Sequence, residues 1–491
     1  MKVLLINSLT CNSKVDNLEH FYHFPVGLLS IGTLLEASSI NVKIVDYNNL
    51  FYTQSGYIDS SHKSIVNYIQ ETLPNYLEEF KPDIIGIGCI FTSAFESSLS
   101  IAKIVKKLKP RVPIALGGIH ATIFSRKIME EHFDIDYIII AEGEYSFLEL
   151  VENFKNNKKN IDSIDGIGYR KDGSIIINDK KIYIDKLDEM PYINFNLVDI
   201  NYYRFDTSKW FSPKKIDVGL PFPILSSRSC PRSCNFCSMY LVHGPKIRLR
   251  SAIHVADEIE YLYNEFGARY FSFVDDNFTF HKKRILDLCE IILKKGLDIQ
   301  FDTPNGAAIY ALDAEIIDAM VSAGLVKINL SPESGSEYIR NEIIGKKIKN
   351  EKIYEIINHC AKHKSLFIGA FFIIGLPQET QETLNETLNM VKQLPIDRAS
   401  FSLAAPYPGT KLYDYCTKHN LLDHNFKQTS DYKNNYQWRS TLDNTLKPYF
   451  KPHKITEEQL LYSIRKGRKI MQDKRRLVNV PENYPIRYHQ S

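Results

Sequence analysis

The sequence contains no long apolar run. Its longest one, from Phe367 to Pro377, is well short of the about 20 apolar residues that a membrane-spanning helix needs. We therefore predict a buried strand there and no membrane contact. The opening stretch, Met1 to Asn7, is too short and too soon polar for a signal peptide, so we predict a cytoplasmic protein.

The chain also lacks an excess of either charge. Its 491 residues include 61 Lys and Arg against 58 Asp and Glu, which gives a net charge of +3. Because a nucleic-acid-binding protein usually shows more asymmetry, we expect no nucleic acid partner. The apolar fraction of 44% is ample for buried cores, and the length suggests about three domains.

A disulfide framework is absent as well. Five of the eight cysteines are scattered singly, whereas Cys230, Cys234 and Cys237 lie close together. In a chain this long, such a distribution is typical of a reducing compartment and of one cysteine-rich site.

What the chain does have is a regular alternation of strand and helix patterns, which predicts an α/β protein with parallel sheets covered by helices. The first block, residues 1–155, predicts a small doubly wound, Rossmann-like domain. Its predicted strands are Lys2–Ile6, Val42–Asp46, Ile84–Gly88, Pro113–Leu116 and Tyr137–Ile140. Residues 156–215 have weaker periodicity and are predicted to be a linker with a hairpin and a loop.

The second block, residues 216–412, has six strand–helix units, fewer than the eight of a closed TIM barrel. We therefore predict a partial, TIM-like (β/α)6 barrel. Its predicted strands are Ile224–Ser227, Arg269–Val274, Asp298–Phe301, Val326–Ser331, Phe367–Ile374 and Arg398–Ala404, with helices at about 252–266, 282–295, 313–323, 350–364 and 381–393. Residues 413–491 predict a small, mostly helical C-terminal domain with a helix at Glu457–Lys474.

The strongest local signal is the segment from Cys230 to Cys237, which reads CPRSCNFC and follows the first predicted barrel strand. Barrels of this kind carry their active sites on such loops. Thiolates hold iron–sulfur clusters, and a full shell needs four of them, so three leave one iron open to a substrate. Two other interpretations remain: a zinc site with His243 as the fourth ligand, and cysteines that only pack.

The Cys-x3-Cys-x2-Cys spacing, with Phe236 before the last cysteine, resembles the radical S-adenosylmethionine (SAM) superfamily. In that family the three cysteines hold a 4Fe-4S cluster whose open iron binds SAM. An electron from the cluster then splits SAM, and the resulting 5′-deoxyadenosyl radical takes a hydrogen atom from the substrate. The resemblance covers about residues 220–412 and implies an external one-electron donor, such as flavodoxin or ferredoxin.

Later segments agree with this family in their order along the barrel. The SAM contacts that the resemblance implies are Phe236, Asp275, Glu333, Ser334, Ile373 and Gly375. Simpler interpretations remain for two of them: Asp275 could belong to a helix N-cap, and Gly375 could serve only a turn.

The N-terminal block has no GxGxxG segment after its first strand, so we do not expect NAD or FAD. Polar segments follow its third, fourth and fifth strands, at the edge where doubly wound sheets bind ligands. Their order resembles the cobalamin-binding domain of one large branch of radical SAM enzymes. The cobalamin contacts that this implies are Thr92, Ser93, Gly117, Gly118, His120, Glu142 and Gly143.

One departure from cobalamin proteins matters. The Asp-x-His-x-x-Gly segment, whose His ligates cobalt in cobalamin mutases and methionine synthase, is absent. Cobalamin would then bind without a protein His on cobalt, as this branch allows. Two alternatives stay open: a domain that kept the fold and lost the cofactor, and a His120 that is simply a buried structural residue.

The combined resemblance implies a cobalamin-dependent radical SAM methyltransferase. Such an enzyme methylates an unactivated carbon of a small molecule or natural product through methylcobalamin, using one SAM for the methyl group and a second for the radical. The same branch also forms rings, contracts rings and carries out anaerobic oxidations without methyl transfer. A non-catalytic cobalamin or Fe–S sensor is a third possibility. A methylthiolating RNA enzyme is not expected, because no second set of three cysteines exists.

Overall fold

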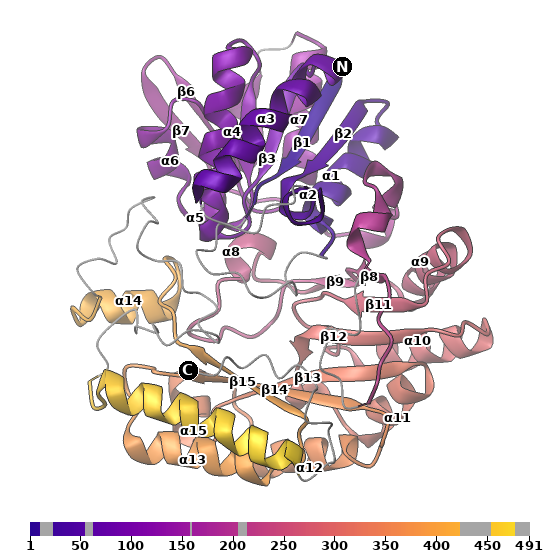
Figure 1. Cartoon of the computed structure of the whole chain (residues 1–491), viewed down its shortest axis with the longest axis vertical. Coiled ribbons are helices and arrows are strands. Elements are labelled where there is room, and N and C mark those ends of the chain that lie inside the picture. The colour runs from indigo at the N-terminus through magenta and orange to yellow at the C-terminus, as the bar shows by residue number, and fades with distance from the viewer. Residues whose placement is uncertain (10–22, 55–61, 158–159, 205–213, 423–452, 477–491) are drawn as a thin grey trace. The chain divides into compact units, whose positions relative to one another are not determined.

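The computed structural model describes residues 1–9, 23–54, 62–157, 160–204, 214–422 and 453–476 (Figure 1). These residues form two compact units. The first consists of the described residues up to Arg204 together with Leu241–Gly244. The second contains the rest of the described residues.

The first unit is built on a seven-stranded sheet with the order β2-β1-β3-β4-β5-β6-β7. Its strands are β1 (Lys2–Asn7), β2 (Asn41–Asp46), β3 (Ile84–Gly88), β4 (Ile114–Gly117), β5 (Tyr137–Ile139), β6 (Ile167–Lys171) and β7 (Ser174–Asn178). The first five are parallel, in the doubly wound order typical of flavodoxin-like domains, which confirms the predicted fold. The hairpin predicted in the linker is β6–β7, and it extends this sheet antiparallel to β5.

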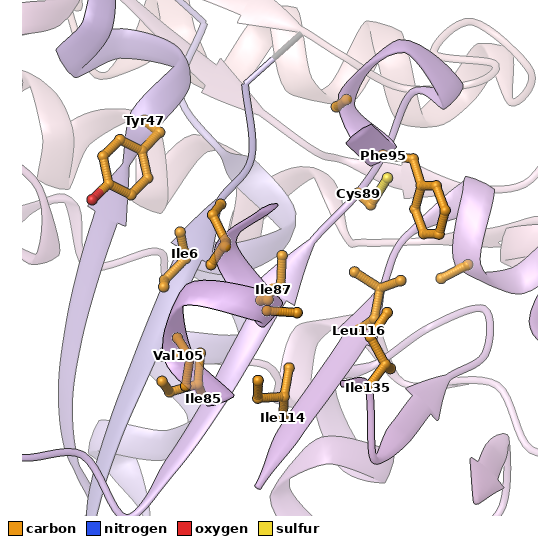
Figure 2. Packing of buried hydrophobic residues seen from close by; sticks show 14 of the residues in the cluster. Ile6, Tyr47, Ile85, Ile87, Cys89, Phe95, Val105, Ile114, Leu116 and Ile135 are labelled. Atoms are coloured by element: carbon orange, nitrogen blue, oxygen red, sulfur yellow. The ribbon is translucent and has the colours of Figure 1, made fainter. Parts of the chain in front are cut away.

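Helices cover both faces of this sheet, so its central strands are apolar along their whole length. The helices are α1 (Val26–Ala37), α2 (Tyr47–Gln54), α3 (His62–Phe80), α4 (Phe95–Leu108), α5 (Ile119–Ile123), α6 (Ser125–Glu131) and α7 (Glu144–Lys155). Figure 2 shows one of the two resulting cores, where Ile85 and Ile87 of β3 pack with Val105 of α4 and Leu116 of β4. This packing fixes the carboxyl ends of the strands, where the polar segments begin.

The second unit is built on a six-stranded parallel sheet with the order β15-β14-β13-β12-β11-β8. Its strands are β8 (Pro221–Ile224), β11 (Tyr270–Phe273), β12 (Gln300–Ala307), β13 (Leu325–Glu333), β14 (Phe367–Ile374) and β15 (Arg398–Leu403). The connecting helices are α9 (Ala252–Glu265), α10 (Lys282–Lys294), α11 (Ala314–Ser322), α12 (Asn350–Cys360) and α13 (Gln381–Gln393). The strand order runs straight through from edge to edge, as predicted for an open six-unit barrel.

The first barrel strand lies earlier than predicted. The strand that pairs with β11 is Pro221–Ile224, whereas Ser227 lies in a short strand, β9 (Ser227–Arg228), antiparallel to β10 (Arg248–Leu249). Two prolines in β8 hide it from a propensity-based prediction, but β8 is an edge strand, where proline is tolerated. The predicted helix 350–364 also ends early, at Cys360.

After β15 the chain forms α14 (Lys411–Lys418) and, further on, α15 (Glu457–Arg476), which agrees with the predicted C-terminal helix. Helix α15 packs against α13 and β15 (Figure 1), and Lys474 Nζ donates a hydrogen bond to the Leu394 carbonyl (2.6 Å). The α15 helix therefore completes the second unit. Among the described helices, none is both long and apolar enough to cross a lipid bilayer.

Candidate cofactor sites

The three-cysteine loop follows β8 and β9, and several segments of the second unit hold it. The Asn235 amide donates to the Ile344 carbonyl (3.0 Å), and the Asn235 carbonyl accepts from the Leu412 amide (2.8 Å). Next to Cys230, the Ser229 amide donates to Asp276 Oδ2 (2.9 Å). The loop is thus fixed by its backbone, leaving the thiols available to a ligand.

Asp275 is buried just after β11 and is directed toward the chain that enters the loop. Its carboxylate accepts hydrogen bonds from the Ser226 amide (3.2 Å), from Ser226 Oγ (2.8 Å) and from Ser227 Oγ. Burial raises the pKa of Asp275, and the positive charge of Arg284 acts in the opposite direction. The helix N-cap interpretation is wrong, because His281 caps α10.

The three sulfur atoms of Cys230, Cys234 and Cys237 are not close enough together to meet at one metal ion. A tetrahedral zinc ion with 2.3 Å bonds to sulfur would hold its thiolates about 3.8 Å apart. Within the described part of the chain, only Asp318, His359 and His363 bring three donor atoms within 4.8 Å of one another. The zinc alternative also asks for His243, whose Nδ1 instead lies 3.3 Å from Glu142 Oε1 in the first unit.

Burial raises the pKa of the Cys234 thiol to about 11 and that of the Cys237 thiol to about 12. These buried thiols carry protons when no metal is present, and binding a cluster releases them. Three neighbouring, partly buried thiols on a loop at the carboxyl edge of the sheet fit an iron–sulfur cluster.

Beside Cys230 lies a polar group that the sequence analysis did not single out. Asn277 Nδ2 donates to Cys230 Sγ (3.3 Å) and to the Tyr310 hydroxyl (2.7 Å). The Arg232 guanidinium lies 4.0 Å from the centre of the Tyr310 ring. Tyr310 follows β12, so the contact joins three loops that are distant in sequence. No local sequence motif predicts this contact.

On the other side of the loop is a small apolar cluster. Cys234, Phe236 and Ile373 pack against a buried set that includes Leu376. Gly375 follows Ile373 with φ +84°, a conformation that favours glycine, and its amide donates to the buried carboxylate of Glu379. The structure thus brings two of the predicted SAM contacts, Phe236 and Ile373, together with Cys234, and Gly375 lies two residues beyond Ile373.

The remaining two predicted SAM contacts lie at the end of β13. Glu333 is buried with φ +64°, a strained value for a residue with a side chain, and its carboxylate pairs with Lys346 at 2.7 Å. Ser334 is fully buried, and its hydroxyl lies 3.2 Å from Thr387 Oγ1. The pairing of Glu333 offsets much of the cost of burying its charge.

In the first unit, the predicted cobalamin residues gather at the carboxyl edge of the sheet. Gly118 has φ +107°, and a Cβ there would lie 2.4 Å from the Cys89 carbonyl oxygen. The Gly118 carbonyl accepts from Thr122 Oγ1 (2.9 Å), which in turn accepts from the Ala141 amide (2.8 Å). The loops after β3, β4 and β5 therefore contact one another around Gly117 and Gly118, where the backbone carries no side chain.

This edge fits a large flat cofactor. Next to Gly118, Ile90 and Phe91 expose 43% and 42% of their surface, which is unusual for apolar side chains so close to a core. Ser93 and Thr92 lie in the short 3₁₀ helix that follows, Thr92–Ala94. Exposed apolar groups beside a side-chain-free glycine pair suit the face of a corrin ring.

His120 and Glu142 are deeper than their neighbours. The His120 ring lies between Phe95 and Phe124, with centroid distances of 4.6 and 4.8 Å, and its Nδ1 is 3.1 Å from Thr92 Oγ1. Burial lowers the pKa of His120 to about 3, so the ring is neutral. Glu142 accepts from the Ile184 amide (3.0 Å), and Gly143 precedes α7. These positions suit residues that hold the loops at the carboxyl edge of the sheet better than residues that contact cobalamin themselves.

Comparison with known proteins finds a family match in each of the two units. The "Radical SAM superfamily" family model matches residues 224–391, and the "B12 binding domain" model matches residues 19–151. An uncharacterized methyltransferase of Pyrococcus horikoshii is 32% identical over 392 residues, covering 80% of this chain and 79% of that protein. The cytidylyl-2-hydroxyethylphosphonate methyltransferase of Streptomyces wedmorensis is 26% identical, covering 86% and 83% of the two chains.

Among solved structures, the radical SAM methyltransferase TsrM of Kitasatospora setae, with cobalamin and a [4Fe-4S] cluster bound, has the same fold. Its TM-score is 0.71 at 16% identity, with 97% of this chain and 99% of that one covered. The two family models and the relatives identify an enzyme that combines radical SAM chemistry with a corrin. The chain belongs to the radical SAM superfamily and carries a B12 binding domain. Its cofactors are a 4Fe-4S cluster, SAM and cobalamin.

Proposed function

We propose that this enzyme transfers a methyl group from SAM to an unactivated carbon of a small molecule, with cobalamin as the methyl carrier. One observation carries the proposal: the methyltransferase of P. horikoshii aligns with 80% of the chain at 32% identity, across both cofactor-binding units. When bound, the cluster supplies the electron that splits SAM, and cobalamin supplies a carrier for the methyl group.

The residues of the second unit divide into ligands and supports. Cys230, Cys234 and Cys237 would hold the cluster, within the predicted barrel domain 216–412. Phe236 and Ile373 form an apolar wall beside them, which would exclude water from bound SAM. Glu333 and Gly375, at the ends of β13 and β14, would line the SAM site, with the Glu333 carboxylate held by Lys346 and the Gly375 amide held by Glu379.

In this proposal, Asp275 and Ser334 do not contact SAM directly. Their side chains are bonded within the protein, to Ser226 and Ser227 and to Thr387 respectively. They would position the loops that contact SAM.

In the first unit, within the predicted domain 1–155, Gly117 and Gly118 would let the corrin approach the backbone. Thr92 and Ser93 would contact its edge. His120, Glu142 and Gly143 would support the loops from below, because the structure places His120 among aromatic rings and Glu142 against the Ile184 amide.

The test is to reconstitute the enzyme anaerobically with cobalamin, iron and sulfide, then to add SAM and a reductant such as flavodoxin. We expect cobalamin-dependent formation of S-adenosylhomocysteine and cluster-dependent formation of 5′-deoxyadenosine. A Cys230→Ala, Cys234→Ala, Cys237→Ala variant should lose the cluster and the 5′-deoxyadenosine. If the loaded enzyme released 5′-deoxyadenosine alone, methyl transfer would be ruled out.

Release of 5′-deoxyadenosine without S-adenosylhomocysteine would favour the non-methylating alternative. The anaerobic magnesium-protoporphyrin IX monomethyl ester cyclase of Cereibacter sphaeroides is 28% identical over 370 residues, covering 74% of this chain and 57% of that protein. Product mass distinguishes the two reactions, because methylation adds one CH2 and ring formation adds no carbon.

We further propose that the enzyme works in the cytoplasm with an external one-electron donor. The seven cysteines in the described regions are free thiols, which is typical of a reducing compartment.

A further inference from the structure

Helices α11 and α12 of the second unit carry a group of metal-ligand side chains. His359 lies in the last turn of α12, His363 follows just beyond it, and Asp318 lies in the middle of α11. Both imidazole Nε2 atoms are 2.7 Å from the same oxygen, Asp318 Oδ1. The sequence analysis did not predict this group, because its members come from two helices that are distant in sequence.

The arrangement has the dimensions of a metal site. The three donor atoms all lie within 4.8 Å of one another. Zinc is held at about 2.0–2.2 Å by imidazole nitrogen and carboxylate oxygen, so each donor would need to move by under about 1 Å to reach a common ion. His359, in the last turn of α12, and His363, in the turn that follows the helix, both direct Nε2 at the same carboxylate oxygen, so small side-chain adjustments could complete the site.

The exposure of the three side chains also leaves a path for a cation. The His359 and His363 side chains are only 17% and 25% exposed, whereas the carboxylate is 52% exposed. An ion could thus enter from solvent past Asp318 and meet two nitrogens already turned toward it.

The position in the fold separates this group from the cysteine loop. His363 lies four residues before β14, at the edge where the parallel strands begin. The cysteine loop follows β8 and β9 at the opposite edge, where the strands end. The group therefore belongs to no step of the proposed reaction, and its chemistry is that of a link between two outer helices of the barrel.

We propose that Asp318, His359 and His363 form a divalent transition-metal site that joins α11 to α12. Zinc is the ion whose preferences match two imidazoles and one carboxylate, with water at the fourth position. Bound zinc stabilises the helix pair, because it binds the folded chain and not the separated helices.

The test uses untagged, anaerobically reconstituted enzyme that has been freed of loose metal with a chelator and desalted. Zinc is added, excess is removed, and zinc, iron and thermal unfolding are measured. We expect one zinc per chain beyond the cluster iron, together with a higher unfolding temperature. The His359→Ala, His363→Ala variant should lose both effects, with its iron content and SAM cleavage unchanged.

Two single variants refine the result. Asp318→Asn keeps the size of the side chain and can still accept a hydrogen bond from an imidazole, but should weaken zinc binding at least about tenfold because the charge is lost. Asp287→Asn, at an exposed carboxylate of α10 that pairs with Lys283, should behave like the unaltered enzyme. If the double variant retained as much zinc as the unaltered enzyme, or if neither retained any, the three side chains would be only a hydrogen-bonded group.

Discussion

At Cys230, a single amide side chain connects the thiol to a tyrosine whose ring lies under an arginine. Asn277 donates to both Cys230 Sγ and the Tyr310 hydroxyl, and Arg232 covers the Tyr310 ring. Hydrogen bonds to cluster sulfurs stabilise the reduced cluster, which carries more negative charge. Asn277 is therefore placed to influence how easily the cluster accepts an electron.

We expect Asn277→Ala to assemble the cluster but to lower its reduction potential. Losing one hydrogen bond worth about 1 kcal/mol corresponds to about 40 mV for a one-electron couple. The measurement is a potentiometric titration followed by electron paramagnetic resonance. Asn385→Ala, at an exposed position of α13, is the control and should leave the potential unchanged. An unshifted potential in Asn277→Ala would show that this contact does not reach the cluster.

Glu379 is a second residue with a measurable signature. It is fully buried after β14, accepts from the Gly375 and Leu376 amides, and burial raises its pKa to about 8 from an ordinary value of 4.5. Between these two pH values the folded chain holds a proton that the unfolded chain has released. Stability from this residue is thus fully present below pH 4.5 and is lost as the pH rises toward 8.

We expect Glu379→Gln to flatten the fall in unfolding temperature between pH 5 and 8. The amide stays neutral and can accept the same hydrogen bonds, so the variant should be more stable than the unaltered enzyme at pH 8, by on the order of 4 kcal/mol at most. Glu382→Gln, at an exposed carboxylate nearby, serves as the control and should leave the slope unchanged. Parallel curves for Glu379→Gln and the unaltered enzyme would contradict the raised pKa.

The sequence predicted residue roles only where they form a local motif. Cys230, Cys234 and Cys237 lie within eight residues, so their spacing alone pointed to a cluster. Asn277 and Tyr310 approach Cys230 from 47 and 80 positions away along the chain, and only the strand order of the barrel brings them there. Lys346, the partner of Glu333, lies in the segment between β13 and α12, whose path the local sequence pattern does not predict.

Among the elements, the turn between β4 and α5 contains two adjacent glycines with different structural requirements. Gly117 has room for a methyl group, since its nearest neighbour would be 3.6 Å from an added Cβ. Gly118 has none, because its Cβ would meet the Cys89 backbone at 2.4 Å and its φ is +107°. Substitutions at the two positions can therefore distinguish an effect on cobalamin binding, at Gly117, from an effect on folding, at Gly118.

We expect Gly117→Ala to fold normally and to bind less cobalamin, because the added methyl group lies where the corrin would approach. Gly118→Ala should instead destabilise the first unit by about 1–3 kcal/mol through strain and the clash with backbone. Corrin absorbance per chain and thermal unfolding provide the two readouts. A Gly117→Ala protein with full cobalamin content would place the corrin elsewhere.

Element positions were predictable where burial dictates the residue type. The parallel strands are covered on both faces, so β3 and β14 are continuous apolar runs with clear ends. β8 was misplaced because Pro221 and Pro223 argue against a strand unless its place at the sheet edge is known. Edge position is a property of the whole sheet and is not encoded in the local sequence.

At the scale of the whole molecule, each cofactor site rests on its own sheet and core. We expect the two sites to load independently. The triple cysteine variant should keep its cobalamin, and Gly117→Ala should keep its iron. Metal and corrin analysis of the two purified variants is sufficient. Joint loss of both cofactors in either variant would mean that one unit cannot fold without a loaded partner.

The packing of α15 has a practical consequence for engineering the chain. Gly467 lies so close to the Phe401 ring that an added Cβ would come within 2.4 Å of it, and α15 lies along β15, the edge strand of the open barrel. Without α15, the buried Phe401 side chain and the apolar sheet face around it would be exposed, and exposed apolar patches promote association with other molecules. A fragment trimmed back to the end of α14 would therefore tend to aggregate, however well its cofactor residues were preserved. Expression fragments and fusion junctions should be placed beyond Arg476.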